Sequence, residues 1–178
     1  AERPDVFVLA GDFCDDQTAP YDMLTACGLV GGVKAAYGTF FVYGNHDLGG
    51  HGPALRYAPD ALKQALAENG VTILDDACAS AAGACYVAGR RDAWLARSIG
   101  GRIPLPELLK HADAAKPVIL LDHQPLDTEQ AARCGVMLQL SGHTHAGQIW
   151  PASMIGRLLP IADVFYGHRV IGNCHVIV

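Results

Sequence analysis

Four short stretches of the chain carry side chains that can bind a metal ion. They are GDFCD (11–15), GNHD (44–47), DHQP (122–125) and GHTH (142–145), and each directly follows a run of apolar residues. Together they offer carboxylate, amide and imidazole groups, a set that suits manganese, iron or zinc better than a structural zinc cage. Each stretch alone has an ordinary explanation as a helix cap, a turn or a core histidine. Their recurrence at four places in order favours one metal site.

Within these stretches the spacing of the residues separates those that can bind metal from one that can contact a substrate. His143 and His145 lie two positions apart, so both can face a metal if the chain there stays extended. The side chains of the neighbours Asn45 and His46 diverge, so one can bind metal while the other reaches a substrate. The candidate site residues are therefore Asp12, Asn45, His46, His123, His143 and His145.

The elements that must position these residues are short buried strands. Apolar runs rich in Val, Ile, Leu and Phe alternate with helix-like segments, which predicts an α/β fold with strands covered on both faces. Strands are expected at residues 6–10, 39–43, 71–74, 85–88, 118–121, 136–140 and 174–178. Helices are expected at 60–68 and 104–114, and a glycine-interrupted pair of helical pieces is expected within 21–38. The carboxyl ends of strands in such sheets converge on one crevice, where the four stretches should meet.

Composition limits the kinds of partner that the chain can have. With 178 residues, of which 51% are hydrophobic, the chain can bury one core, and we expect a single domain over residues 1–178. No apolar run approaches the roughly 20 residues that span a bilayer. The net charge is −5 and no basic tract exceeds Arg90-Arg91, so no nucleic-acid partner is expected. The six cysteines are irregularly spaced and are expected to be free thiols, with a Cys78–Cys85 disulfide as the alternative.

With these residues in view, the sequence resembles the calcineurin-like metallophosphoesterase superfamily. The motifs of that superfamily run D-x-H, G-D-x-x-D, G-N-H-D/E, a lone H and G-H-x-H, and the four stretches match the last four in order. The forms LLDHQP and SGHTHAGQIWP look like a bacterial, often membrane-linked branch that cleaves phosphodiesters or the pyrophosphate of UDP-diacylglucosamine. The resemblance implies an α/β/β/α sandwich of two mixed sheets flanked by helices.

The resemblance also implies a role for each matching residue. Asp12 would bridge two divalent ions (Mn, Fe or Zn), and Asn45, His123 and His143 would complete the second ion site. His145 would belong to the first site. The two ions of the complete family site activate a hydroxide that attacks phosphorus. His46 would stand near the leaving oxygen as the catalytic acid or hydrogen-bond donor.

One family motif has no counterpart here. No D-x-H precedes the first predicted strand, so the first site is reduced to Asp12 and His145, and we expect a domain truncated at both ends. Such a chain should bind at most about one metal tightly and be weakly active. The expected substrate is small and phosphorylated or lipid-linked, membrane contact would come through the missing segments, and the sequence does not define the oligomeric state.

Two other functions compete with hydrolysis. A metal-poor scaffold of the same fold would explain the absent D-x-H but not the retained His46. A dinucleotide-binding protein has only the glycines of GLVGG (28–32) in its favour. Three residues also keep two interpretations each: Asp47 can orient a ligand or stabilise its turn, and Arg90 and Arg91 can reach a phosphate or form a solvated surface pair.

Overall fold

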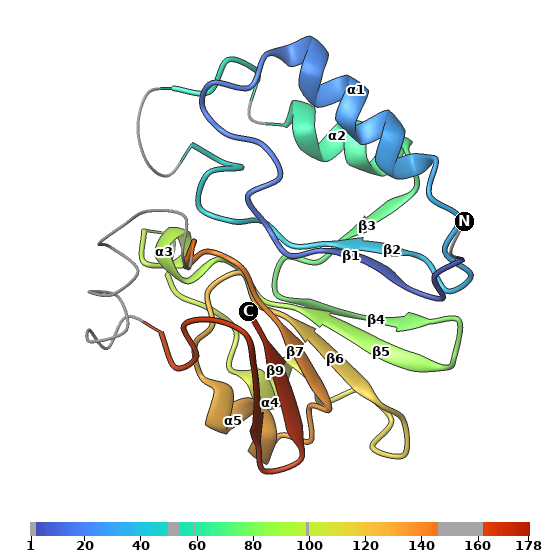
Figure 1. Cartoon of the computed structure of the whole chain (residues 1–178), viewed down its shortest axis with the longest axis vertical. Helices are drawn as coiled ribbons and strands as arrows, with labels where there is room; N and C mark the ends of the chain where they lie inside the picture. The colour runs from blue at the N-terminus through green and yellow to red at the C-terminus, as the bar shows by residue number, and fades with distance from the viewer. Residues whose placement is uncertain (1–2, 50–53, 59, 99, 146–161) are drawn as a thin grey trace.

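Two β-sheets lie face to face between two helical layers (Figure 1). The computed structural model describes residues 3–49, 54–58, 60–98, 100–145 and 162–178. The first sheet is parallel, with strand order β1-β2-β3. It consists of β1 (Phe7–Leu9), β2 (Thr39–Phe41) and β3 (Val71–Ile73). Helices α1 (Pro20–Gly31) and α2 (Ala61–Glu68) cover its outer face (Figure 1).

The second sheet is larger and mixed, with strand order β4-β5-β6-β7-β9-β8. Its strands are β4 (Ala77–Ala81), β5 (Cys85–Gly89), β6 (Val118–Leu121), β7 (Leu138–Leu140), β8 (His168–Ile171) and β9 (Cys174–Ile177). The four central strands are parallel, and β4 and β8 run antiparallel at the two edges. Helices α4 (Leu105–Leu108) and α5 (Thr128–Arg133) cover the outer face, and the short α3 (Ala93–Ala96) follows β5. The α/β/β/α sandwich implied by the resemblance is confirmed, with a parallel first sheet and a mixed second sheet.

Strict alternation of side chains builds the layers of the core. Phe40 points between the sheets, whereas its neighbour Phe41 points toward α1 and α2. Leu121 likewise faces the first sheet, and Leu120 packs under α4 and α5. Both faces of these strands are therefore buried, which explains why they are apolar at every position.

Strand prediction succeeded where burial leaves a strong sequence signal. All seven expected strands are present, with ends that differ by at most two residues. Two strands in the described part of the chain were not expected. The sequence of β4, ACASA, is poor in β-branched and aromatic residues, and most of β8 is exposed, so neither shows the pattern of a buried strand.

Two helix predictions were wrong in length. The segment 21–38 contains one helix, α1, which ends at Gly31, and not two pieces, because Gly28 lies within α1 where a Cβ would meet no atom within 4 Å. The helix predicted over 104–114 ends after Leu108. Asp113 accepts a hydrogen bond from the Ala115 N–H at 3.0 Å, which favours a turn in place of the last helical residues.

Two further features of the described residues bear on the sequence analysis. All six cysteines are free, and the β4–β5 register pairs Cys78 with Ala88 and Cys85 with Ala81, so the two thiols are not opposite each other. None of the helices described here combines the length and the apolar character that crossing a membrane requires.

Candidate metal centre

Three predicted metal ligands come together at the carboxyl ends of the strands. Asp12, His123 and His143 each bring one ligand atom to within 4.8 Å of the others. Asp12 follows β1 of the first sheet, whereas His123 and His143 follow β6 and β7 of the second. A fourth predicted ligand, Asn45, is buried after β2, and its Oδ1 lies 2.8 Å from His143 Nδ1. The two sheets thus supply two of these four residues each.

His145 does not join this group of three. The sequence argument placed His143 and His145 on one side of an extended chain, but the backbone there is not extended. His143 has φ 67° and His145 has φ 49°, both in the left-handed region. Both residues are exposed, so exposure does not distinguish them. The premise that both histidines face one point therefore does not hold for this stretch.

The tautomer of His123 leaves a lone pair directed at the centre. His123 Nδ1 lies 2.7 Å from the Ala10 carbonyl oxygen, which can only accept, so Nδ1 carries the proton. The other ring nitrogen, Nε2, is buried and lies 3.1 Å from Asp12 Oδ2 without the geometry of a hydrogen bond. In the neutral ring both atoms are acceptors. Two facing acceptors need a cation between them, so the residues fit a metal ion.

Without a metal, a proton takes the place of the cation. Burial lowers the pKa of His123, but the Asp12 carboxylate and the hydrogen bond to the Ala10 carbonyl raise it, and the net shift is upward. Burial raises the pKa of Asp12, but His123 and the His46 N–H lower it, and the net shift is downward. Below the raised pKa of His123 the metal-free residues form an ion pair, and a metal must displace the proton.

This ion pair predicts how the stability of the metal-free chain depends on pH. A raised pKa of His123 stabilises the fold below the unfolded value of 6.5, and that contribution is lost as pH rises through the folded value. We expect the free energy of unfolding in urea, with a chelator present, to fall as pH rises above about 6.5. His123→Gln should remove this part of the slope. The same slope in that variant would contradict the assignment.

Two glycines make the close approach of the loops possible. Gly11 has φ 88°, and a Cβ there would lie 2.5 Å from His123 Nδ1. A Cβ on Gly44 would lie 2.5 Å from the Asp12 backbone nitrogen and would overlap the Asp12 carboxylate. Only glycine can occupy these two positions, because backbone and ligand atoms already fill the space that a Cβ would need.

Asp47 holds two of the motif loops together through their backbones. Its buried carboxylate accepts N–H bonds from Asp12 at 2.8 Å, Phe13 at 2.8 Å, Cys14 at 2.9 Å and Gly44 at 2.7 Å. Burial raises its pKa to about 6, although the N–H donors favour the ionised form. Asp47 thus acts on the backbone of the loop that carries Asp12, which itself has φ 53°. Such a strained conformation persists only where the surroundings fix it.

His46 lies next to the centre, half-buried, in the same loop. Its backbone N–H donates to Asp12 Oδ1 at 2.9 Å. The bond occupies one carboxylate oxygen of Asp12 and leaves Oδ2 to face His123. The GNHD stretch therefore contributes to the centre through the Asn45 side chain, the His46 backbone and the Asp47 carboxylate.

The structure favours neither interpretation of Arg90. Its side chain is buried and bonds Asp127 at 2.7 Å, with Asp122 at 3.8 Å, so it is neither a solvated pair nor directed at an external phosphate. Arg102, which the sequence analysis missed, also bonds the fully buried Asp122. No local pattern marks Arg102, because it lies in a loop between two short helices. Arg91 bonds Asp75 at the surface, as a solvated pair would.

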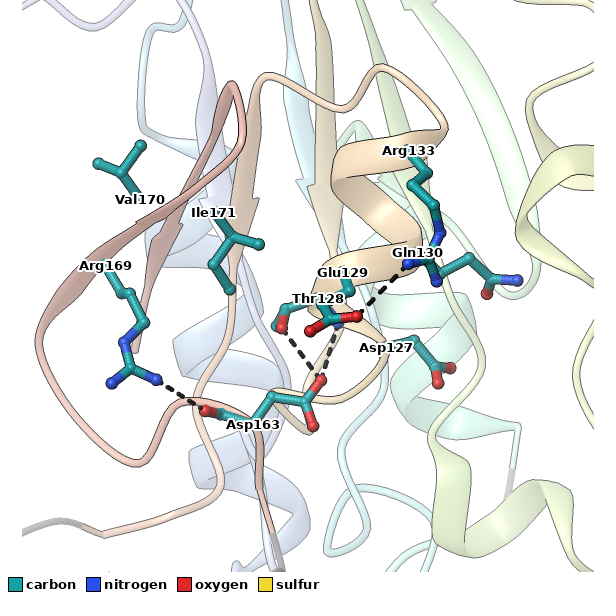
Figure 2. Close-up of a pocket in the computed structure, with 9 residues that line it drawn as sticks. All are labelled: Asp127, Thr128, Glu129, Gln130, Arg133, Asp163, Arg169, Val170 and Ile171. Atoms are coloured by element: carbon teal, nitrogen blue, oxygen red, sulfur yellow. Dashed lines mark hydrogen bonds and ion pairs between the residues drawn. The ribbon is translucent and has the colours of Figure 1, made fainter.

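A separate pocket lies between α5 and β8 (Figure 2). None of the four clustered residues lines it. Asp163 reaches across it to the Thr128 N–H at 2.9 Å and hydroxyl at 3.0 Å. Asp163 therefore caps the start of α5, and the pocket has a structural explanation.

The fold and the cluster together define a class of protein: a four-layer α/β/β/α sandwich with a group of potential metal ligands at the carboxyl ends of its strands. The chain belongs to the calcineurin-like phosphoesterase family, whose sequence model matches residues 1–147. The family implies divalent metal ions and hydrolysis of phosphoesters.

Curated relatives and one solved structure agree with this assignment. A transmembrane protein with metallophosphoesterase domain of Bos taurus is 35% identical over 88% of this chain and 36% of its own length. An uncharacterized metallophosphoesterase of Helicobacter pylori is 31% identical over 86% of this chain and 39% of its own length. The chain therefore spans well under half of these two relatives. A crystal structure aligns with a TM-score of 0.58 and 12% identity over 99% of this chain and 80% of the other, which shows the fold alone.

Proposed function

We propose that this chain holds a divalent ion with Asp12, Asn45, His123 and His143 and hydrolyses a phosphodiester or pyrophosphate bond. The observation that carries the proposal is His123 Nε2, which is buried without a hydrogen-bond partner and lies 3.1 Å from Asp12 Oδ2. Carboxylate, amide and imidazole donors suit Mn²⁺, Fe²⁺ or Zn²⁺. Because His145 lies outside the cluster of three, we propose one tightly held ion and a weaker first site at Asp12 and His145.

The residues around the ion would have different roles in the reaction. A bound ion would supply Lewis acidity that neutralises charge on the phosphoryl oxygens and would lower the pKa of water. His123, locked by the Ala10 carbonyl, keeps its free lone pair directed inward. His46 stands at the edge of the centre, where it can donate a proton or hydrogen bond to the leaving oxygen. Asp47 accepts hydrogen bonds from the Asp12 and Gly44 backbones and so holds together the two loops that position the ligand oxygens of Asp12 and Asn45.

The substrate proposal follows the family branch that the motifs resemble. We propose a small phosphorylated or lipid-linked substrate, with membrane contact supplied by parts of the whole protein beyond this chain. The name of the Bos taurus relative, a transmembrane protein with metallophosphoesterase domain, supports a membrane-linked whole protein.

Hydrolysis of bis(p-nitrophenyl) phosphate in manganese, with metal content measured on the same samples, tests the function. We expect His46→Ala to lower the rate about 100-fold or more, the usual contribution of a general acid, and to leave metal content unchanged. His111→Ala is the matched control, because His111 is an exposed histidine outside the four motifs. A chain that retains no metal, and whose rate does not respond to His46→Ala, would favour the scaffold.

A further inference from the structure

A second pair of histidines lies outside the centre, on the hairpin of β8 and β9. In this antiparallel pair Val170 is opposite His175 and His168 is opposite Ile177, so the two histidines are diagonal neighbours on one face. Gly172, with φ 58°, opens the two-residue turn between Ile171 and Cys174. A glycine at the first turn position is typical of hairpins with tight, defined register.

The face that carries the two histidines is open to solvent. Along β9 exposure alternates, so His175 and Ile177 are exposed while their neighbours are buried. Val170, opposite His175 on this face, is 52% exposed. Arg169 points to the opposite face of the strand, as alternation requires, so its charge is directed away from the pair. The rings can therefore turn toward an external ligand without disturbing the core.

The nitrogen atoms of the pair are spaced as two ligands of one ion are. His168 Nε2 and His175 Nδ1 share a hydrogen bond at 2.9 Å, and the ring planes differ by 4°. Two imidazole nitrogens at ordinary bond lengths from one Zn²⁺, at tetrahedral or octahedral angles, are about 2.9–3.4 Å apart. An ion that binds both nitrogens would take the place of the proton in this hydrogen bond. No backbone movement is needed to bring the nitrogens to this spacing.

We propose that His168 and His175 form a second metal site, distinct from the Asp12 centre and specific for borderline ions such as Zn²⁺, Ni²⁺ or Cu²⁺. The ligands are two imidazoles, without the carboxylate and amide oxygens that Mn²⁺ prefers. Two protein ligands leave the remaining positions of the ion to water or to an outside group. The site does not depend on the function proposed for the Asp12 centre.

Calorimetric titration of the full chain with Zn²⁺ tests this site. The variant with both His123→Ala and His143→Ala should lose the Asp12 centre and still bind one Zn²⁺ per chain. Adding His168→Ala or His175→Ala should abolish that remaining binding, whereas adding His111→Ala should not. Titration with Mn²⁺ in place of Zn²⁺ should give no comparable binding to the pair. Circular dichroism of each variant checks that the fold is kept, which the exposure of both rings leads us to expect.

The imidazole resonances give an independent readout on the unmodified chain. Zn²⁺ should shift the ring signals of His168 and His175 together, at the same ion concentration. Equal Zn²⁺ binding with and without His168→Ala, or a shift in only one of the two rings, would overturn the proposal.

Discussion

Asp47→Ala is expected to destabilise the chain by about 4 kcal/mol or more and to abolish metal binding. Each buried donor left without its acceptor costs about 1–3 kcal/mol, and Asp47 serves four backbone N–H groups of two loops. The loss is largest for the loop of Asp12, whose left-handed backbone depends on these bonds. Urea unfolding and metal analysis of the purified chain measure the two effects.

Asp15→Ala is the matched control for this prediction. Asp15 also accepts several bonds, from Gln17 N–H at 3.0 Å, Thr18 N–H at 2.8 Å and the Thr18 hydroxyl at 2.7 Å, but it is exposed. Water can replace those bonds, so we expect a loss of no more than about 1 kcal/mol and normal metal content. Similar losses in the two variants would show that the burial of Asp47 has no special role.

Gly44→Ala is expected to lower activity about 100-fold, although it adds only one methyl group. The new Cβ would lie 2.5 Å from the Asp12 backbone nitrogen and overlap its carboxylate, so Asp12 must move away from His123. A displacement of about 1 Å in a catalytic group commonly costs about this much in rate. Rates with bis(p-nitrophenyl) phosphate and the affinity for Mn²⁺ should fall together.

Gly28→Ala separates this steric effect from the general effect of replacing glycine. No atom lies within 4 Å of a Cβ on Gly28, which is inside helix α1. Alanine there should raise the free energy of unfolding by roughly 0.5–1 kcal/mol and leave activity unchanged. If Gly44→Ala were as well tolerated as Gly28→Ala, the tight contact between the loops would not be required.

The sequence predicted the parts of the site that follow directly from strand ends. Asp12, His123 and His143 each come just after an apolar strand, and parallel strands end at one edge of a sheet, so their meeting could be anticipated. The left-handed backbone of His143 and His145 could not be anticipated, because no glycine marks either position. The sequence indicated the role of Asp47 only in part, because its hydrogen-bond donors lie up to 35 residues away in the chain, in a loop that packing brings near.

The fold shows the same division between local pattern and distant contact. Strands buried on both faces, such as β2 and β6, were evident from unbroken apolar runs, whereas β4 and β8 pair at edges without a distinctive composition. The burial of Arg90 was also hidden, since its partners Asp122 and Asp127 come from another part of the chain. Adjacent arginines in a sequence give no sign that one is internal and the other external.

The division of the ligands between the two sheets has a mechanical consequence. Asp12 and Asn45 extend from one sheet and His123 and His143 from the other, so an ion bound to all four would act as a cross-link that fastens the two layers at one end. At a free ion concentration 100 times the dissociation constant, binding adds about 2.7 kcal/mol to the folding stability. The hydrophobic contact between the sheets would hold the two layers together away from the ion. The concentration of available metal would then affect the stability of the contact between the two sheets as well as catalysis.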